Sequence, residues 1–121
     1  MQKRILIADD NKIIRQVVKD VLSATLDIHD CQEAANGREA IERAERSKPD
    51  LIILDIAMPE MDGITAAKHL KESMHETPII LFTMYDLQRY GAKELGVDAV
   101  VSKPEGLGKL TQEIESLLAV R

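Results

Sequence analysis

Four short apolar runs, each followed by a polar or charged residue, constrain the fold of this chain more than any other feature. The runs occupy residues 5–8, 51–54, 79–82 and 99–102. Apolar runs of this length without a polar interruption are typical of strands that are covered on both faces of a sheet. The pattern therefore predicts central strands of a parallel sheet, because antiparallel strands more often alternate apolar and polar residues.

Longer segments with helical periodicity lie between these runs. Apolar residues recur at helical spacing within residues 13–22, 40–44, 64–74, 87–95 and 107–118. A weaker run over residues 28–34, with polar residues interleaved, predicts an edge strand. Strands that alternate with helices predict an α/β fold, here a doubly wound five-stranded parallel sheet of the form (βα)5 with helices on both faces.

The residues that follow the apolar runs share one property: each carries a chemically active side chain. Asp9 and Asp10 follow the first run, Asp55 the second, Thr83 the third and Lys103 the fourth. In open parallel sheets, ligands bind outside the carboxyl ends of the strands. Any one of these residues alone would be an ordinary helix cap, loop residue or solvated charge. Their joint occurrence at strand ends predicts a common site.

The chemistry of such a site follows from its charges. Carboxylates that crowd together raise one another's pKa at a cost in stability, and a bound cation removes that cost. Mg²⁺ (or Mn²⁺) prefers oxygen ligands and typically takes one or two carboxylates together with a phosphate oxygen. An aspartate can also attack phosphorus as a nucleophile. Lys103 and Thr83 would then contact phosphoryl oxygens.

Composition limits the other possibilities. The length of 121 residues suits one domain, assigned here to residues 1–121, and 45% hydrophobic residues allow a substantial core. A net charge of −5 argues against a nucleic-acid surface. We expect no membrane segment, since no stretch approaches about 20 apolar residues. The single cysteine, Cys31, fits a reducing cytosol, so a cytoplasmic location is expected.

The chain resembles the receiver domain of two-component response regulators, of which the single-domain chemotaxis regulator is the familiar example. Four motifs carry the resemblance, and together they are highly specific. They are Ile7-Ala8-Asp9-Asp10, the stretch from Asp55 to Gly63 (DIAMPEMDG), Leu81-Phe82-Thr83 and Ser102-Lys103-Pro104. The resemblance extends from Ile5 to Leu118. It implies a flavodoxin-like fold with strand order 2-1-3-4-5, which places the first and third strands side by side.

The resemblance also implies a role for each residue of the site. Asp55 looks like the phosphoacceptor, which receives a phosphoryl group from a phosphohistidine of a sensor histidine kinase or phosphotransfer protein. Asp10 looks like a direct Mg²⁺ ligand, Asp9 a ligand through water, and Asp55 and the backbone carbonyl of Ala57 further ligands. The protein would then be no enzyme in the usual sense, because it would promote only its own phosphorylation and dephosphorylation.

Thr83 and Lys103 look like the pair that senses the acyl phosphate. The Lys103–Pro104 bond resembles one that is often cis in this family. Phosphorylation would rearrange the face made by the fourth helix, the fifth strand and the fifth helix. That face would act on a downstream protein target or on an output domain missing from this chain.

Three positions depart from the family pattern. Val100 stands where the family often has Tyr or Phe, so the aromatic half of the switch is absent. Met84 replaces the usual small residue after the switch threonine and would crowd the phosphoryl site. Ala57 offers no polar group to orient a hydrolytic water. We therefore expect Tyr85, Met84 and solvent access to shape the phosphorylated state more than Ala57 does.

Two alternatives stay open on the sequence alone. A pseudo-receiver would have the same fold and act as an interaction module without being phosphorylated; the presence of all the acidic, hydroxyl and lysine positions argues against it. A haloacid-dehalogenase-type phosphatase also uses a nucleophilic aspartate. That enzyme would need its nucleophile early in the chain and a second aspartate two residues later, where this chain has Ala57 after Asp55.

Overall fold

The computed structural model describes residues 2–85 and 90–119. Five strands form the sheet: β1 (Arg4–Ala8), β2 (Asp30–Ala34), β3 (Leu51–Leu54), β4 (Ile79–Thr83) and β5 (Ala99–Ser102). The helices are α1 (Lys12–Leu26), α2 (Gly37–Ser47), α3 (Gly63–Ser73) and α4 (Leu107–Ala119), with a short 3₁₀ turn, η1 (Lys103–Glu105), after β5. No helix within the described residues has both the length and the apolar character needed to cross a bilayer.

The sheet is parallel throughout, and its strand order is β2-β1-β3-β4-β5. This confirms the predicted order 2-1-3-4-5 and the flavodoxin-like fold. The weakly apolar strand β2 lies at one edge of the sheet, as predicted, and pairs only with β1. Four of its five residues are only partly buried. The uninterrupted strand β3 lies at the centre of the sheet, where all four of its residues are buried.

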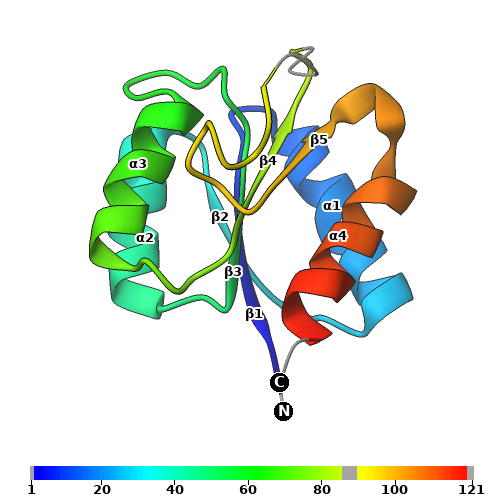
Figure 1. Ribbon diagram of the computed structural model, residues 1–121. Helices are drawn as coiled ribbons and strands as arrows, with labels where there is room; N and C mark the ends of the chain where they lie inside the picture. Colours follow the sequence, from blue (N-terminus) through cyan, green and yellow to red (C-terminus); the bar gives the residue numbers. More distant parts are fainter. Residues whose placement is uncertain (1, 86–89, 120–121) are drawn as a thin grey trace.

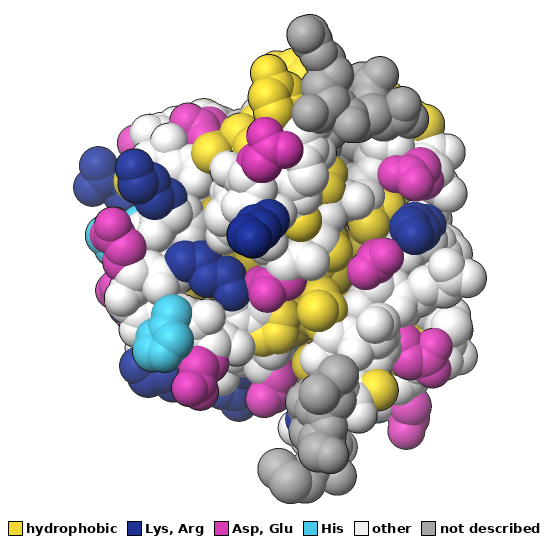
Figure 2. All heavy atoms as spheres, viewed as in Figure 1, with side chains coloured by type: hydrophobic (Ala, Val, Ile, Leu, Met, Phe, Trp, Pro, Cys, Tyr) yellow, Lys and Arg dark blue, Asp and Glu magenta, His cyan; other side chains and the backbone are white. Residues whose placement is uncertain are grey.

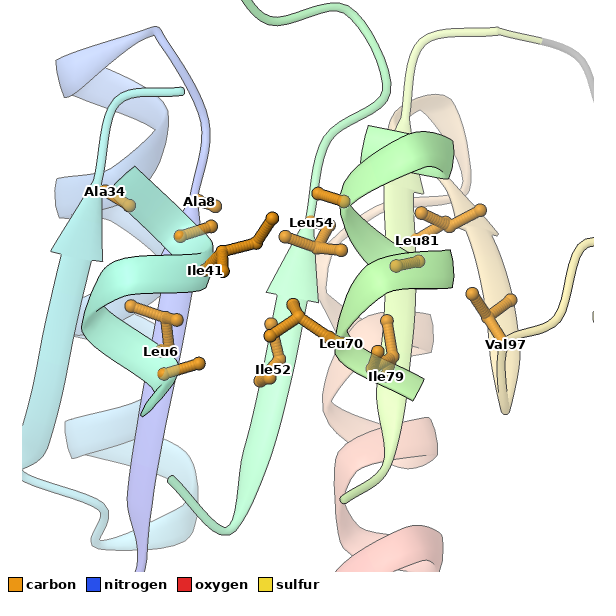
Figure 3. Packing of buried hydrophobic residues seen from close by; sticks show 14 residues of the cluster. Leu6, Ala8, Ala34, Ile41, Ile52, Leu54, Leu70, Ile79, Leu81 and Val97 are labelled. Carbon is orange, nitrogen blue, oxygen red and sulfur yellow. The ribbon is translucent and has the colours of Figure 1, made fainter. Parts of the chain in front are cut away.

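Two layers of helices cover the sheet, and the alternation of side chains along each strand divides the core between them (Figure 1). Leu6 and Ala8 face a cluster that includes Ile41 of α2 and Leu70 of α3 (Figure 3). Ile5 and Ile7 point the other way, into a cluster with α1 and α4. Each helix therefore buries one apolar face, which explains the helical periodicity in the sequence.

Polar residues fix where the helices begin. The Asn11 side chain accepts hydrogen bonds from the backbone amides of Ile13 and Ile14 and caps α1. Asn36 caps α2 and Asp62 caps α3 in the same manner. Side-chain oxygens at these positions satisfy amides that have no partner inside the helix. Each cap follows a strand or loop on the same edge of the sheet, so helix starts and strand ends gather there.

The prediction of a helix over residues 87–95 is wrong for the residues of this range that the structure describes. Residues 86–89, including Leu87, lie outside the described residues, and residues 92–96 form consecutive turns instead of a helix. Glycine explains the outcome: Gly91 opens this stretch, and Gly96 ends it with a left-handed φ of 75°. The described chain therefore has four α-helices rather than five, and the helix expected last, over residues 107–118, is α4.

A groove of about 480 Å³ lies between α3 and these turns. Its lining combines apolar Ile64 and Leu95 with the charged residues Lys68 and Lys93. Figure 2 shows the same view as Figure 1: basic side chains gather on the side of α2 and α3, and apolar side chains remain visible near the centre of this face. The switching face predicted from the family is thus built without a regular helix at residues 92–96.

Candidate functional site

Asp9 and Asp10 lie at the carboxyl end of β1 and differ sharply in exposure. The Asp9 residue is 3% exposed, whereas Asp10 is exposed to solvent. The Asp9 amide donates to the carbonyl of Ala34 at 3.0 Å, which extends the pairing of β1 with β2 by one residue. Its Oδ1 accepts from the Asn11 amide at 2.8 Å. Asp9 is therefore held by backbone groups on two sides, while Asp10 faces outward.

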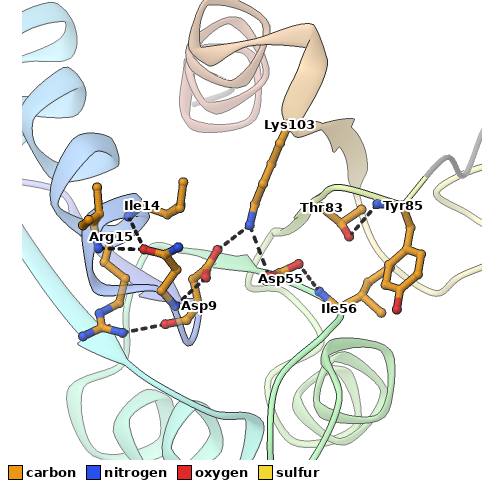
Figure 4. Close-up of polar contacts among 10 residues, drawn as sticks. Asp9, Ile14, Arg15, Asp55, Ile56, Thr83, Tyr85 and Lys103 are labelled. Carbon is orange, nitrogen blue, oxygen red and sulfur yellow. Dashed lines mark hydrogen bonds and ion pairs between the residues drawn. The ribbon is translucent and has the colours of Figure 1, made fainter.

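Asp55 occupies the equivalent position after β3. It is 7% exposed, and its amide donates to the Ala8 carbonyl at 2.9 Å, which places it beside the end of β1. The Ile56 amide donates to Asp55 Oδ1 at 2.7 Å and orients the carboxylate. The second oxygen, Oδ2, is thereby directed toward the other residues of the site (Figure 4).

Two glycines pack bare backbone against the loop that follows Asp55. The Gly63 amide donates to the Ile56 carbonyl at 2.9 Å, and a Cβ at Gly63 would lie 1.9 Å from the Asp55 carbonyl oxygen. On the other side, a Cβ at Gly37 would lie 2.3 Å from the carbonyl oxygen of Met61. No side chain fits at either point. The loop of residues 55–63 is therefore fixed at its end by α3 and near Met61 by α2.

Lys103 joins the two buried carboxylates. Its Nζ lies 2.7 Å from Asp9 Oδ2 and 3.2 Å from Asp55 Oδ2, and its side chain is 12% exposed (Figure 4). Burial alone would lower the pKa of Lys103, but the hydrogen bonds and charges of Asp9 and Asp55 outweigh it and raise the pKa above its usual value. The ammonium also lies 5.9 Å from the ring centre of Phe82, over its face.

The three carboxylates form a group suited to a divalent cation. One oxygen from each of Asp9, Asp10 and Asp55 lies within 4.8 Å of the others. Oxygen-only donors with partial exposure match the preference of Mg²⁺, which keeps several of its waters. Lys103 contacts two of the three acids, so the group as a whole retains excess negative charge. The donor set therefore fits Mg²⁺.

Thr83 ends β4, the strand that neighbours β3, and is fully buried. Its Oγ1 accepts a hydrogen bond from the Tyr85 amide at 3.2 Å, which leaves the hydroxyl proton available for donation. Figure 4 shows Thr83 on the same edge of the sheet as Asp55 and Lys103. Met84 and Tyr85, which follow, are 67% and 55% exposed.

The remaining predicted positions lie near the site with different surroundings. Ala57 is exposed in the loop after Asp55. Val100 lies on β5 and packs against the core cluster of α2 and α3, so its small side chain is part of the core. The Lys103–Pro104 bond is trans, as are all peptide bonds of the described residues, in contrast to the cis bond suggested by the resemblance.

Arg15 is a further residue of the site that is not among those predicted from the sequence. This side chain of α1 is only 14% exposed, and its Nη1 donates to the Asp9 carbonyl oxygen at 2.6 Å. A signal was available: Arg15 lies beside the apolar stripe of α1, one turn before Lys19, and the edge strand carries an acidic residue, Glu33. Which of several arginines reaches a backbone carbonyl is a matter of tertiary geometry, however, and periodicity alone does not reveal it.

Comparison with known proteins places this geometry in a family. The response regulator receiver domain profile matches residues 5–115. A protein-glutamate methylesterase/protein-glutamine glutaminase of Archaeoglobus fulgidus is 40% identical over 92% of this chain and 34% of its own length. The response regulator protein VraR of Staphylococcus saprophyticus is 32% identical over 94% of this chain and 56% of its own length. The chain thus spans about a third to just over half of these relatives.

Solved structures agree with the profile match. Response regulator protein TrrA of Thermotoga maritima, in complex with Mg²⁺-BeF, is 31% identical and superposes with a TM-score of 0.86. The alignment covers 96% of this chain and 99% of that one. The sheet order, the strand-end acids and the profile match lead to one conclusion. The chain belongs to the response regulator receiver domain family of two-component signalling systems.

Proposed function

We propose that Asp55 accepts a phosphoryl group from a phosphohistidine on a sensor histidine kinase or a phosphotransfer protein. The single observation that supports this most strongly is the convergence of Asp55 with Asp9, Asp10 and Lys103 at one edge of the sheet. Asp55 follows β3, the strand between β1 and β4, so it lies between the acids that follow β1 and Thr83 at the end of β4. It is therefore the carboxylate best placed to attack phosphorus.

The transfer balances as a single displacement. An oxygen of the Asp55 carboxylate forms a bond to phosphorus while the phosphorus–nitrogen bond of the donor breaks, and the electron pair returns to the imidazole nitrogen, which takes up a proton. The products are an aspartyl phosphate and a free histidine. Water reverses the modification by hydrolysis of the acyl phosphate. Each chain carries one phosphoryl group at a time, so the protein acts as an acceptor rather than a multiple-turnover catalyst.

The other residues stabilise charge on the transferred group. Lys103 exchanges part of its contact with Asp55 for a phosphoryl oxygen, and the free Thr83 hydroxyl proton is donated to another. Asp10, Asp55 and the Ala57 carbonyl would hold Mg²⁺, with Asp9 contributing through water, and the bound ion would neutralise negative charge on the phosphoryl group. Positioning and charge stabilisation are most of what phosphoryl transfer requires of a protein.

The proposed function also implies a downstream target for the modified domain. We infer that residues 1–121 form one receiver domain, and that its modified form controls a downstream protein or an attached output domain. The matched region covers 34% of the methylesterase and 56% of VraR, which supports an attached domain. Because phosphohistidine is made from ATP, we expect the reaction in the cytoplasm.

Intact-mass spectrometry tests the proposal. The chain is incubated with phosphoramidate and Mg²⁺, and then with autophosphorylated histidine kinases. The kinases are included because the Met84 side chain is expected to crowd the phosphoryl site and slow the entry of small donors. We expect one phosphoryl group per wild-type chain, none on Asp55→Ala, and one on Asp20→Ala, which removes an exposed acid of α1. Wild-type protein that stays unmodified with every donor would indicate a pseudo-receiver and refute the proposal.

A further inference from the structure

Arg15 is a nearly buried cation that the phosphoryl-transfer chemistry does not use. Its Nε donates to Glu33 Oε1 at 2.8 Å, and its Nη1 donates to the Asp9 carbonyl oxygen at 2.6 Å (Figure 4). One guanidinium thus connects α1, strand β2 and the loop that carries Asp9 and Asp10. An arginine is suited to this because its donors keep a fixed, planar arrangement.

The accepting oxygen has a particular place in the chain. The Asp9 carbonyl belongs to the peptide unit that joins Asp9 to Asp10, so the hydrogen bond from Arg15 fixes the orientation of that unit. No hydrogen bond within residues 2–85 and 90–119 holds the Asp10 carboxylate itself. The direction in which Asp10 leaves the backbone therefore depends on how firmly this peptide unit is held.

Glu33 holds Arg15 in turn. Its second oxygen, Oε2, accepts from Lys19 Nζ at 3.0 Å, so the carboxylate is fixed between two cations. The hydrogen bond from Arg15 is the largest cause of a lowered pKa at Glu33, and Lys19 adds to it against the effect of burial. Glu33 is thus charged at neutral pH and keeps Arg15 aligned with the Asp9 carbonyl.

We propose that Arg15 is a positioning residue for the metal site: with Glu33, it sets the backbone between Asp9 and Asp10 so that the carboxylate of Asp10 is presented to Mg²⁺. The inference rests on the proposed function for the role of the metal, but not for the effect on the backbone. Groups that orient a metal ligand typically change metal affinity by about 10- to 100-fold when removed.

The chain contains a matched control for this arrangement. Arg4, at the opposite end of β1, donates from Nε to Asp30 of β2 at 2.9 Å and from Nη1 to the Ser47 carbonyl at 2.6 Å. Like Arg15, Arg4 joins a β2 carboxylate to a backbone carbonyl, here the one at the end of α2, but it lies far along the strand from the acids. Its side chain is 40% exposed against 14% for Arg15, so Arg4→Gln removes a similar set of contacts without touching the site.

The sign of the effect separates geometry from charge. If Arg15 acted only through its positive charge, its removal would strengthen the binding of a cation. Positioning predicts the reverse, a weaker site. Lys19→Gln supplies the charge comparison, because Lys19 contacts the same Glu33 carboxylate but, within the part of the chain that the structure describes, makes no hydrogen bond or ion pair with the Asp9 loop.

The first measurement is Mn²⁺ binding by electron paramagnetic resonance, with Mg²⁺ competition, on proteins that thermal melts show to be folded. We expect Arg15→Gln to weaken binding about tenfold and Arg15→Lys to restore part of it. Arg4→Gln and Lys19→Gln should not weaken binding more than about twofold. Unchanged or tighter binding by Arg15→Gln, or equal weakening by Arg4→Gln, would refute the proposal.

The second measurement needs no metal. Amide hydrogen exchange of Asn11, which donates to Asp9 Oδ1, reports whether the loop is ordered. We expect exchange at Asn11 to accelerate about tenfold in metal-free Arg15→Gln, which is a loss of about 1.4 kcal/mol of local protection, and to stay unchanged in Arg4→Gln. If wild-type protein bound no metal, the proposed function would fail, and this comparison would still decide whether Arg15 orders the loop.

Discussion

At the residue scale, Lys103 is expected to have opposite effects on metal binding and on phosphorylation. In the unmodified protein its ammonium contacts Asp9 and Asp55 directly and offsets part of their charge. A divalent cation at the same acids would compete with that contact. In the proposed phosphorylated form, the same ammonium would have a phosphoryl oxygen to contact. Lys103 is thus expected to oppose metal binding and to favour the modified state.

Replacing Lys103 with methionine separates the two tasks. We expect Lys103→Met to bind Mg²⁺ at least about fivefold more tightly, because unit charges 4 Å apart interact by about 1 kcal/mol even in water. Phosphorylation by phosphoramidate at saturating Mg²⁺ should slow by about 100-fold, the usual loss for one stabilising donor. Calorimetric titration and intact-mass time courses measure the two effects. Lys68→Met, on the exposed side of α3, is the control; weaker metal binding by Lys103→Met would contradict this account.

At the scale of elements, the contact between α1 and β2 is electrostatic as well as apolar. Glu33 has a pKa below its usual value, chiefly through its hydrogen bond from Arg15. A lowered folded-state pKa means that Glu33 contributes stability above its unfolded pKa of about 4.3, and that this contribution disappears as the pH falls through the folded value. The contact between α1 and β2 should therefore weaken in acid.

Glu33→Gln tests this through the pH dependence of unfolding. Wild-type protein should lose more stability between about pH 6 and pH 3 than the variant loses, and at neutral pH the variant should be less stable by up to about 1 kcal/mol. Urea unfolding at several pH values provides the measurement. Glu42→Gln, which changes an exposed acid of α2, should leave the slope as it is in wild type. Parallel curves for wild type and Glu33→Gln would exclude the contribution.

The elements also show how far sequence reasoning extends. Uninterrupted apolar runs such as residues 51–54 predicted buried strands because they are too short for a helix and have no polar face. Parallel pairing then determined which residues lie at the carboxyl edge of the sheet. The segment around Gly91 also has apolar residues at helical spacing, yet residues 92–96 form turns, because the segment contains two glycines and few buried side chains. Arg15 was missed for a different reason: its partner is a backbone carbonyl, which no residue pattern records.

At the scale of the whole molecule, repulsion among the carboxylates of Asp9, Asp10 and Asp55 lowers the stability of the fold, and a bound cation should restore it. A ligand that binds only the folded state at about 100 times its dissociation constant stabilises it by about 2.7 kcal/mol. For a domain of this size, we expect Mg²⁺ to raise the melting temperature by roughly 10 °C. Asp10→Asn should abolish most of this increase and melt higher than wild type without metal, because it removes one of the crowded charges.

Differential scanning calorimetry with and without MgCl₂ makes this comparison, and NaCl at equal ionic strength controls for general salt effects. The same increase in Asp10→Asn as in wild type would locate the bound cation elsewhere. A lower melting temperature for metal-free Asp10→Asn would show that repulsion among the three acids is already relieved by Lys103.

Gly37 and Gly63 pack against backbone atoms with no room for a side chain, which limits how the sequence of such a domain can change. Any mutation that adds a side chain at either glycine must displace the segment that carries Asp55, so evolution has little freedom there. Solvent-facing neighbours such as Ala57 and Met84 are under no comparable restriction. If Asp55 is phosphorylated as proposed, related sequences whose acyl phosphates hydrolyse at different rates should therefore differ at those exposed positions, while the two glycines are retained.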